Sequence, residues 1–324
     1  MIVFLVCLFG DYFPGINPSK SFFNIQTRIY ETNSGDYYVS GCKLTGFSNS
    51  AIFFSISASI RLLIENCFIS ESRPSGNIGG GVYFDCSLGD IVLSRSCGYK
   101  CSASECQFGL FRVGTGKTIK LVDNSVSDSY LVTGYATLYT NDPIQVRKGN
   151  QLAQNCNFSR NSGLCASGFQ TFDSDSCSIQ YCTIAKNHAY DSMCVRFEYG
   201  PITLQNSNIV GNSNTKSSWG LIHHHGGTST TSNCCIQDNT CSSGTLIIFY
   251  FYTGSASISS CWIQSSGTLN GVTHQSPIVL FSTYQFTHIP LHLCQYGTPL
   301  KSPRLSTKNL SYFAVFSLII FYDF

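Results

Sequence analysis

Three consecutive histidines are the residues with the most evident capacity for metal chemistry. His223, His224 and His225 stand in a stretch with the composition of a β-strand. Neighbouring side chains of a strand point to opposite faces, so at most His223 and His225 converge, too few for a convincing metal site. Aligning the repeats described below puts Arg196 and Glu198 in an outward row with His224. We therefore interpret His224 as part of a polar surface patch and predict no metal site.

Acidic residues are the next candidates, because hydrolases and lyases need grouped carboxylates as acid, base or calcium ligands. The 17 acidic residues are mostly scattered, and Asp173-Ser174-Asp175 is the best local pair. Its carboxylates could share one face, but placement in a turn is the simpler interpretation. The sequence thus predicts no catalytic residues and no cofactor. The formal net charge of +2, without long runs of either sign, argues against nucleic-acid binding.

A repeated phrase of the form Asn-Cys-x-(Ile/Phe)-x-x-Asn organises the chain. Its clearest copies span residues 155–161, 181–187, 206–212 and 233–239, and weaker copies flank them. The second residue of each copy, which we term the anchor, recurs with a mean interval of about 27 residues. The nine anchors are Cys42, Cys67, Cys97, Ser125, Cys156, Cys182, Ser207, Cys234 and Cys261.

Two short apolar runs with β-type composition accompany each anchor, one before it and one after it, such as residues 201–204 and 220–223. Gly, Ser and Asn separate the runs, and no helical stretch joins them, which excludes βαβ crossovers. Stacked coils let equivalent strands pair in parallel and cover one another. The sequence therefore predicts an all-β fold, a right-handed parallel β-helix of about nine coils between residues 37 and 284.

The anchor phrase has a structural interpretation within such a stack. The Cys and the apolar residue two positions later face the core, because side chains alternate along a strand. The Asn that ends the phrase is expected at a corner, where it adopts left-handed backbone and stacks into an Asn ladder. Because the anchor is Cys or Ser, a ladder of small buried side chains explains it better than disulfides. Some of the 17 cysteines could still pair, and the odd number leaves at least one without an intrachain partner.

The phrases resemble the paired repeats of the polymorphic outer-membrane-protein type, a group that includes β-helix surface proteins of parasitic protists. The first phrase is carried by residues 158–161, 184–187, 209–212 and 236–239, and the second, Gly-Gly-Val-Tyr-like, by residues 80–83 and 220–222. The resemblance covers roughly residues 37–284. It implies a cell-surface or secreted protein used in adhesion or host contact, without assigned catalytic residues.

An apolar segment near the end of the repeats is the most plausible contact surface. Residues 246–252 are apolar on both faces, which would expose a row of Ile247, Phe249 and Phe251 beside His224, unless the C-terminal tail or a partner covers them. The expected partners are host or neighbouring-cell macromolecules or glycans.

The ends of the chain do not follow the repeat. Residues 1–36 are interpreted as a leader and N-terminal cap, and residues 285–324 as a tail of uncertain structure. Residues 1–9 are apolar like the core of a signal peptide but lack a basic start. The apolar run at 312–322 is too short for a full transmembrane span, although membrane attachment stays open. Asn157-Phe158-Ser159 fits a glycosylation sequon.

These patterns favour a non-enzymatic surface or secreted protein that acts in adhesion or macromolecular interaction. The alternative is a polysaccharide-active enzyme of the pectate lyase or polygalacturonase type, which shares the β-helix architecture but requires acidic clusters on one face.

Overall fold

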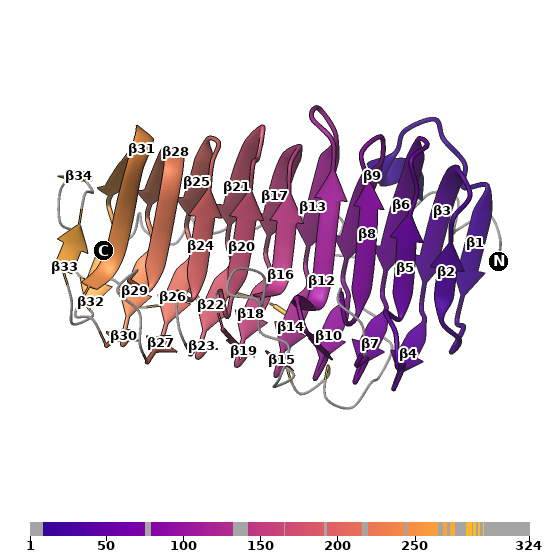
Figure 1. The fold of residues 1–324 in the computed structure, drawn as a ribbon, viewed down its shortest axis with the longest axis horizontal. Helices are drawn as coiled ribbons and strands as arrows, with labels where there is room; N and C mark the ends of the chain where they lie inside the picture. Colours follow the sequence, from indigo (N-terminus) through magenta and orange to yellow (C-terminus); the bar gives the residue numbers. More distant parts are fainter. Residues whose placement is uncertain are drawn as a thin grey trace, which may run out of the picture.

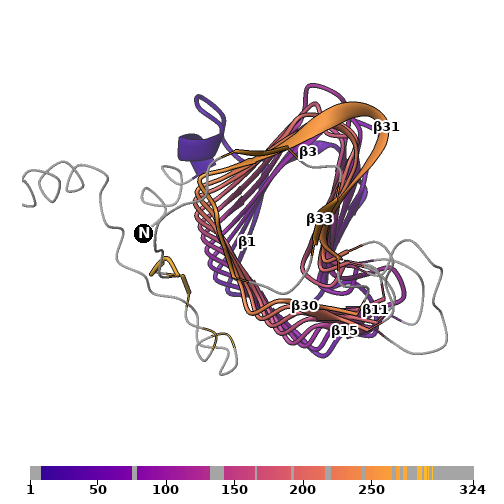
Figure 2. The same cartoon turned by 90° about the vertical axis from the view of Figure 1, so that its left-hand side faces the viewer.

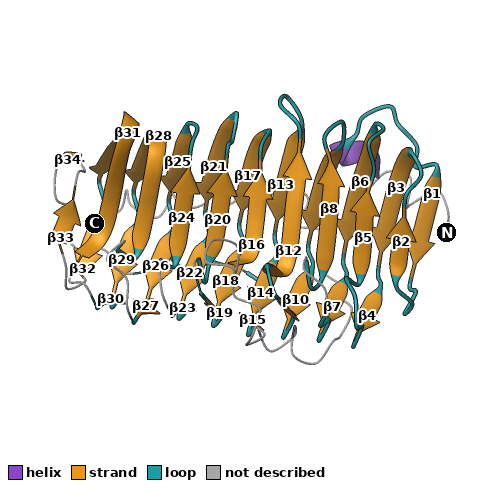
Figure 3. Ribbon diagram, viewed as in Figure 1, coloured by secondary structure: helices purple, strands orange, loops and turns teal. Residues whose placement is uncertain are grey.

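The computed structural model describes residues 9–74, 79–131, 142–164, 166–190, 193–215, 220–242 and 245–264, and also 268–270, 273–275, 283–286, 288–289, 291 and 294. The described chain consists of strands joined by turns and loops, with almost no helix, and the strands pair in parallel between successive coils (Figures 1 and 3). Viewed along the rod, the coils superimpose into flat walls around a common axis (Figure 2). The predicted all-β parallel β-helix is confirmed.

Four walls, each a ladder of parallel strands, run along the rod. The first wall consists of β2 (Ile29–Glu31), β5 (Ile52–Ser55), β8 (Val82–Cys86), β12 (Cys106–Val113), β16 (Asp142–Arg147), β20 (Phe169–Phe172), β24 (Val195–Glu198), β28 (Ile222–Ser232), β31 (Thr245–Ser259) and β33 (Thr268–Asn270). The second wall consists of β1 (Lys20–Phe23), β3 (Gly35–Ser40), β6 (Ile60–Glu65), β9 (Asp90–Ser94), β13 (Thr118–Val122), β17 (Asn150–Gln154), β21 (Ser176–Gln180), β25 (Ile202–Gln205), the second halves of β28 and β31, and β34 (Thr273–Gln275).

Two walls of shorter strands complete each coil. The third wall consists of β4 (Lys43–Thr45), β7 (Phe68–Ser70), β10 (Cys97–Tyr99), β14 (Ser125–Ser127), β18 (Asn157–Ser159), β22 (Thr183–Ala185), β26 (Asn208–Val210), β29 (Cys235–Gln237) and β32 (Trp262–Gln264). The fourth wall consists of β11 (Ser102–Ala103), β15 (Tyr130–Leu131), β19 (Ser162–Gly163), β23 (His188–Ala189), β27 (Ser213–Asn214) and β30 (Thr240–Cys241). The nine strands of the third wall mark nine passes of the chain.

The core lies inside the walls, and every strand of the third wall except β10 contributes one apolar side chain to it. Leu44, Ile69, Phe158, Ile184 and Ile236 are fully buried there. A three-residue strand can present only its central side chain to one face, because side chains alternate. The repeated anchor-x-Ile pattern therefore places one branched or aromatic residue per coil in the core.

Each anchor follows a tight turn into the third wall. The anchor position lies immediately before each strand of the third wall. The residue that precedes this position has left-handed backbone in all nine cases, with φ between 46° and 66°. Asn155 is one of them, and this explains the Asn at the start of the phrase, since Asn tolerates that conformation. The Sγ of Cys156 then donates to the carbonyl of Gln154 at 3.3 Å. Burial raises the pKa of the Cys156 thiol, which keeps it protonated as a donor.

Six of the predicted anchors are free, buried cysteines that make this same contact with the carbonyl two residues earlier. They are Cys42, Cys67, Cys156, Cys182, Cys234 and Cys261. Ser207 also fits the position, because its hydroxyl donates to the Gln205 carbonyl at 2.8 Å and accepts the Cys182 amide at 3.1 Å. The anchor is thus a small donor and acceptor that links a turn to the next coil.

The predicted anchors Cys97 and Ser125 require a correction of one residue. Parallel pairing sets Cys97 opposite both Phe68 and Ser125, so the residues aligned with Cys67 are Ser96 and Asn124. These two do the work of anchors: the Cys67 amide donates to Ser96 Oγ at 3.1 Å, and the Ser96 amide donates to Asn124 Oδ1 at 2.9 Å. Cys97 and Ser125 instead start the strands, one position along, where alternation turns side chains outward.

The predicted Asn ladder is confirmed, with one change. The Nδ2 of Asn161 donates to Asn187 Oδ1 at 3.2 Å, that of Asn187 to Asn212 Oδ1 at 3.0 Å, and that of Asn212 to Asn239 Oδ1 at 3.1 Å. All four are buried. The left-handed backbone belongs to the residue before each of them, for example Lys186 with φ 55°. The ladder Asn is therefore required for its amide and not for its backbone freedom.

A bulge in β12 compensates for a missing core side chain. Gly98 occupies the central, inward position of β10, aligned with Ile69 and Val126. The pairing of β12 with β16 shifts register after Cys106, which inserts an extra residue. Phe108 lies in this bulge, is fully buried, and occupies the space into which a Cβ on Gly98 would project. The ring of Phe108, which the bulge turns inward, thus fills the core space that the absent side chain of Gly98 leaves open.

Part of the segment interpreted as leader and N-terminal cap, from residue 9 onward, packs on or joins the walls. Residues 9–12 form one helical turn outside the second wall (Figure 2). Phe9 and Phe13 pack against Tyr38, Leu63 and Val92 on the outer face of that wall. β1 and β2, which lie within the predicted cap, already belong to the walls.

Candidate binding site on the first wall

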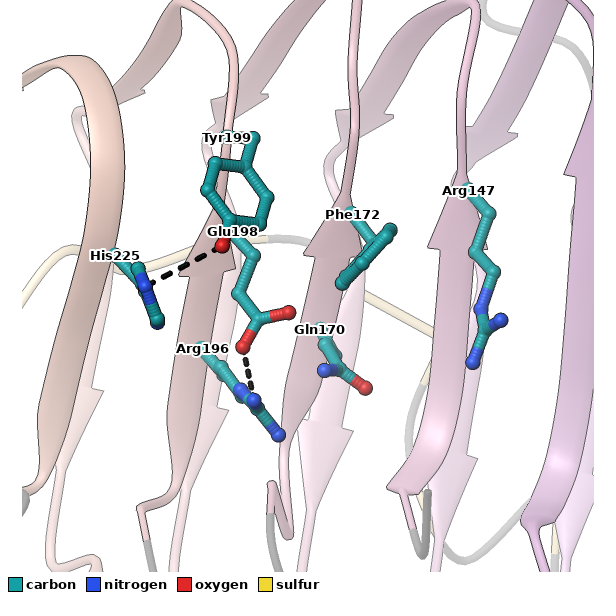
Figure 4. A pocket seen from close by; sticks show the side chains of 7 residues that line it. All are labelled: Arg147, Gln170, Phe172, Arg196, Glu198, Tyr199 and His225. Atoms are coloured by element: carbon teal, nitrogen blue, oxygen red, sulfur yellow. Dashed lines mark hydrogen bonds and ion pairs between the residues drawn. The ribbon is translucent and has the colours of Figure 1, made fainter. Parts of the chain in front are cut away.

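A pocket of about 300 Å³ lies on the outer face of the first wall. Strands β16, β20, β24 and β28 position its lining, one to three residues from each coil (Figure 4). The lining residues are Arg147, Gln170, Phe172, Arg196, Glu198, Tyr199 and His225. Arg196 and Glu198 are the lining residues predicted from the sequence to face outward; the others were not predicted, because they become neighbours only through the parallel register.

An ion pair forms one side of the pocket. Arg196 and Glu198 are two residues apart in β24, so their side chains share the outer face. The Glu198 carboxylate pairs with the Arg196 guanidinium, and the carboxylate side chain is only 4% exposed. Because this arrangement commits the carboxylate to a neighbouring cation, Glu198 is poorly placed to act as a general acid or base.

Arg147 forms the opposite side. Its guanidinium lies 5.4 Å from the centre of the Phe172 ring and donates through Nε to Gln145 Oε1 at 2.7 Å. Among the described residues, no carboxylate lies within ion-pair distance of it. The Gln145 amide continues to Gln170 by a short hydrogen bond. A partly exposed arginine held by a ring and an amide is well suited to bind a carboxylate or another anionic group.

Two aromatic rings and a histidine form the rim between these charges. Phe172 and Tyr199 meet edge to face, with ring centres 5.8 Å apart. Tyr199 follows β24 in a left-handed conformation, φ 51°, and its hydroxyl lies 3.4 Å from His225 Nε2. Figure 4 shows Phe172 between Arg147 and the Tyr199 side of the pocket. Rings and hydrogen-bonding groups in one shallow pocket are typical of sites for polar, partly apolar ligands.

The histidines differ from the sequence prediction. His224 does not lie on the surface with Arg196 and Glu198; it is 3% exposed and aligns with Phe197, whose ring centre is 4.9 Å away. His223 and His225 align with Arg196 and Glu198 instead. A register slip of one residue exchanges the two faces of a strand, which explains the error. Burial lowers the pKa of His224 to about 3.

Asp142 is the most perturbed acid near the pocket. It is fully buried, its Oδ1 accepts the Ala166 amide at 2.6 Å, and its Oδ2 accepts the Gln145 amide at 3.2 Å. Burial raises its pKa to about 7, and Arg196 opposes that rise. Asp142 does not line the pocket. Glu198 is therefore the sole carboxylate that lines it among the described residues, whereas glycoside hydrolysis needs two facing the substrate.

The other predicted contact residues lie in β31. The register aligns Ile247 with Ile222 and Phe249 with His224. Phe251 also belongs to β31, but the side chains of Ile247, Phe249 and Phe251 lie outside the described residues, so their exposure stays a prediction. Within the described part of the chain, no group of three or more His, Cys, Asp or Glu side chains is placed to hold a metal ion.

Comparison with known proteins gives no relative: neither a family model, nor a curated protein, nor a solved structure matches the chain. No helix among the described residues has the length and apolar character needed to cross a bilayer.

Proposed function

We propose that this protein is a non-enzymatic surface or secreted β-helix protein, of the polymorphic outer-membrane-protein type, that acts in adhesion by binding macromolecules along its first wall. The observation that carries this proposal is the pocket around Arg147. It offers a cation, two aromatic rings and an amide, and within the described residues it has no second carboxylate for acid–base chemistry.

The chemistry of the lining favours a carboxylate-bearing sugar of a glycan chain as the ligand. The Arg147 guanidinium would receive the carboxylate. The edges of Phe172 and Tyr199 would contact the apolar side of the sugar. The wall is flat and repeats at the interstrand spacing of about 4.8 Å. A long chain could therefore lie along several coils on both sides of the pocket.

Glycan-array binding of the purified protein tests this proposal. We expect acidic glycans to bind in preference to neutral ones, and Arg147→Gln to weaken binding by about 10- to 100-fold, since a charge-assisted hydrogen bond contributes about 1.5–3 kcal/mol. Lys148→Gln is the matched control, because it removes the same charge from an exposed neighbour outside the pocket. An equal loss in both variants, or no binding to glycans or cells, would refute the proposal. Cleavage of polyuronides by the protein would support the enzyme alternative instead.

A further inference from the structure

The C-terminal segment turns back along the outside of the third wall. We call its described residues between 283 and 294 the strap. Its contacts occur in reverse coil order: Tyr284 meets Asn208, His288 meets Thr183, Ile289 meets Ser125, and Cys294 meets Cys97. The strap therefore crosses the coils from β26 back to β10, at a large angle to the strands. Figure 2 shows pieces of this segment outside the ring of walls.

Side chains of the wall make the polar contacts. Asn208 Nδ2 donates to the Tyr284 carbonyl at 2.9 Å, and the Tyr284 amide donates to Asn208 Oδ1 at 2.9 Å. Thr183 Oγ1 lies 2.8 Å from His288 Nε2, and the Ser125 hydroxyl donates to the Ile289 carbonyl at 2.9 Å. All three wall residues occupy the first, outward position of their strands. This outer row therefore contacts the strap at β26, β22 and β14, twice through the strap backbone and once through the His288 ring.

Apolar contacts accompany the covalent link. Phe68, Cys97 and Cys294 form one buried cluster, and Ile289 packs against it. Cys97 and Cys294 are joined by a disulfide across 197 residues of sequence. Cys97 faces outward and not toward the core, so it cannot serve as an anchor. This outward position presents its sulfur to the strap.

The described strap residues form no strand pairing with the third wall. Their hydrogen bonds to side chains compete with water and must offset the entropy of ordering the segment. The disulfide removes most of that entropy by holding the end of the strap against the wall. Attachment of the strap should thus depend strongly on the covalent bond.

We propose that the strap is a redox-controlled cover of the third wall, latched by the Cys97–Cys294 disulfide. A dithiol reductant opens the latch: the disulfide takes up two electrons and two protons and becomes two thiols, and the reductant becomes a disulfide. The released strap then uncovers the outer row around Phe68, Asn157 and Thr183. This inference is independent of the pocket on the first wall.

The test uses the full chain purified without reductant. Mass spectrometry of a non-reduced digest is expected to find the peptide that holds Cys97 linked to the one that holds Cys294. Brief chymotrypsin treatment is then expected to cut at Tyr284 and Phe286 at least tenfold faster after dithiol treatment, and equally fast in Cys294→Ser. Circular dichroism checks that the β-helix is intact in each sample.

Two further variants separate the latch from its hydrogen bonds. Cys241→Ser changes a cysteine of the fourth wall, away from the strap, and is expected to leave chymotrypsin cleavage unchanged. Asn208→Ala, kept oxidised, is expected to raise cleavage less than reduction does. The proposal is overturned if Cys97 and Cys294 are both free thiols in the unreduced protein, or if reduction and Cys294→Ser leave the cleavage rate at its oxidised value.

Discussion

Asn187 offers the sharpest test of how the coils are held together. Its Oδ1 accepts the Asn161 backbone amide at 3.0 Å, and its Nδ2 donates to the Phe158 carbonyl at 2.9 Å. Asn187→Ala leaves that amide and that carbonyl buried without these partners. At about 1–3 kcal/mol for each unsatisfied group, the expected loss in the free energy of unfolding is about 2–6 kcal/mol. The Asn212 oxygen is spared, because the backbone amide of residue 187 still donates to it.

Urea denaturation followed by circular dichroism measures this loss. Lys186→Ala is the matched control, because it changes the neighbouring exposed residue without touching the ladder, and its expected effect is within about 0.5 kcal/mol. In a solenoid each coil contacts its neighbours alone, so the Asn187 variant should open first at the coils on either side. A loss below about 1 kcal/mol, or one equal to that of Lys186→Ala, would refute the claim that the hydrogen bonds of the Asn ladder stabilise the stacked coils.

Three further predictions concern the bulge, the buried histidine and the sequon. Gly98→Val should destabilise the protein by about 1–3 kcal/mol in thermal melting, because its side chain meets the Phe108 ring; a Gly98→Val/Phe108→Ala double variant that is no better than additive would contradict the shared packing. His224 has a pKa of about 3 when folded and 6.5 when unfolded, so the unfolded state binds more protons below pH 6.5. The free energy of unfolding therefore decreases as the pH is lowered below 6.5. The contribution of His224 to the loss from pH 6.5 to pH 5 is about 1.6 kcal/mol, and His224→Phe should remove that contribution from denaturation curves measured at both pH values, leaving the similar contribution of His223. Asn157 is 9% exposed within the row that the strap crosses, so glycosidase treatment of protein secreted by a host cell should shift the mass of unlatched molecules alone; a glycan on latched molecules would contradict the proposed cover.

The repeat length and the fold could be predicted because the Cys-x-Ile phrase reports a packing rule that each coil obeys. Which residue occupies the anchor position was predicted wrongly in two coils, those of Cys97 and Ser125. At Ser125 a signal was available, since the residue two positions later is Ser127 and the aligned core residue is Val126. At Cys97 it was hidden, because Gly98 supplies no side chain and Phe108, ten residues later, fills its place.

The candidate pocket depends on information that the sequence does not carry locally. Arg147, Phe172 and His225 come from different coils, separated by loops of unequal length. A single-residue error in alignment inverts a strand, and it placed His224 outside when its partner in the core is Phe197. Alternation of apolar and polar residues predicts that a strand is present. Which of its side chains face the core is determined by its pairing with the strands of the two adjacent coils.

The disulfide between Cys97 and Cys294 also determines how the rod would respond to mechanical force. A pull applied beyond residue 294 passes through the disulfide to β10, in the third of the nine passes, and bypasses the coils between them. Those coils are enclosed in a covalent loop of 197 residues and cannot be unwound from the C-terminal end while the bond is intact. Reduction would redirect the same pull to the last strands, which can be removed one coil at a time. The latch thus decides whether tension is carried in shear across a wall or by peeling from an end.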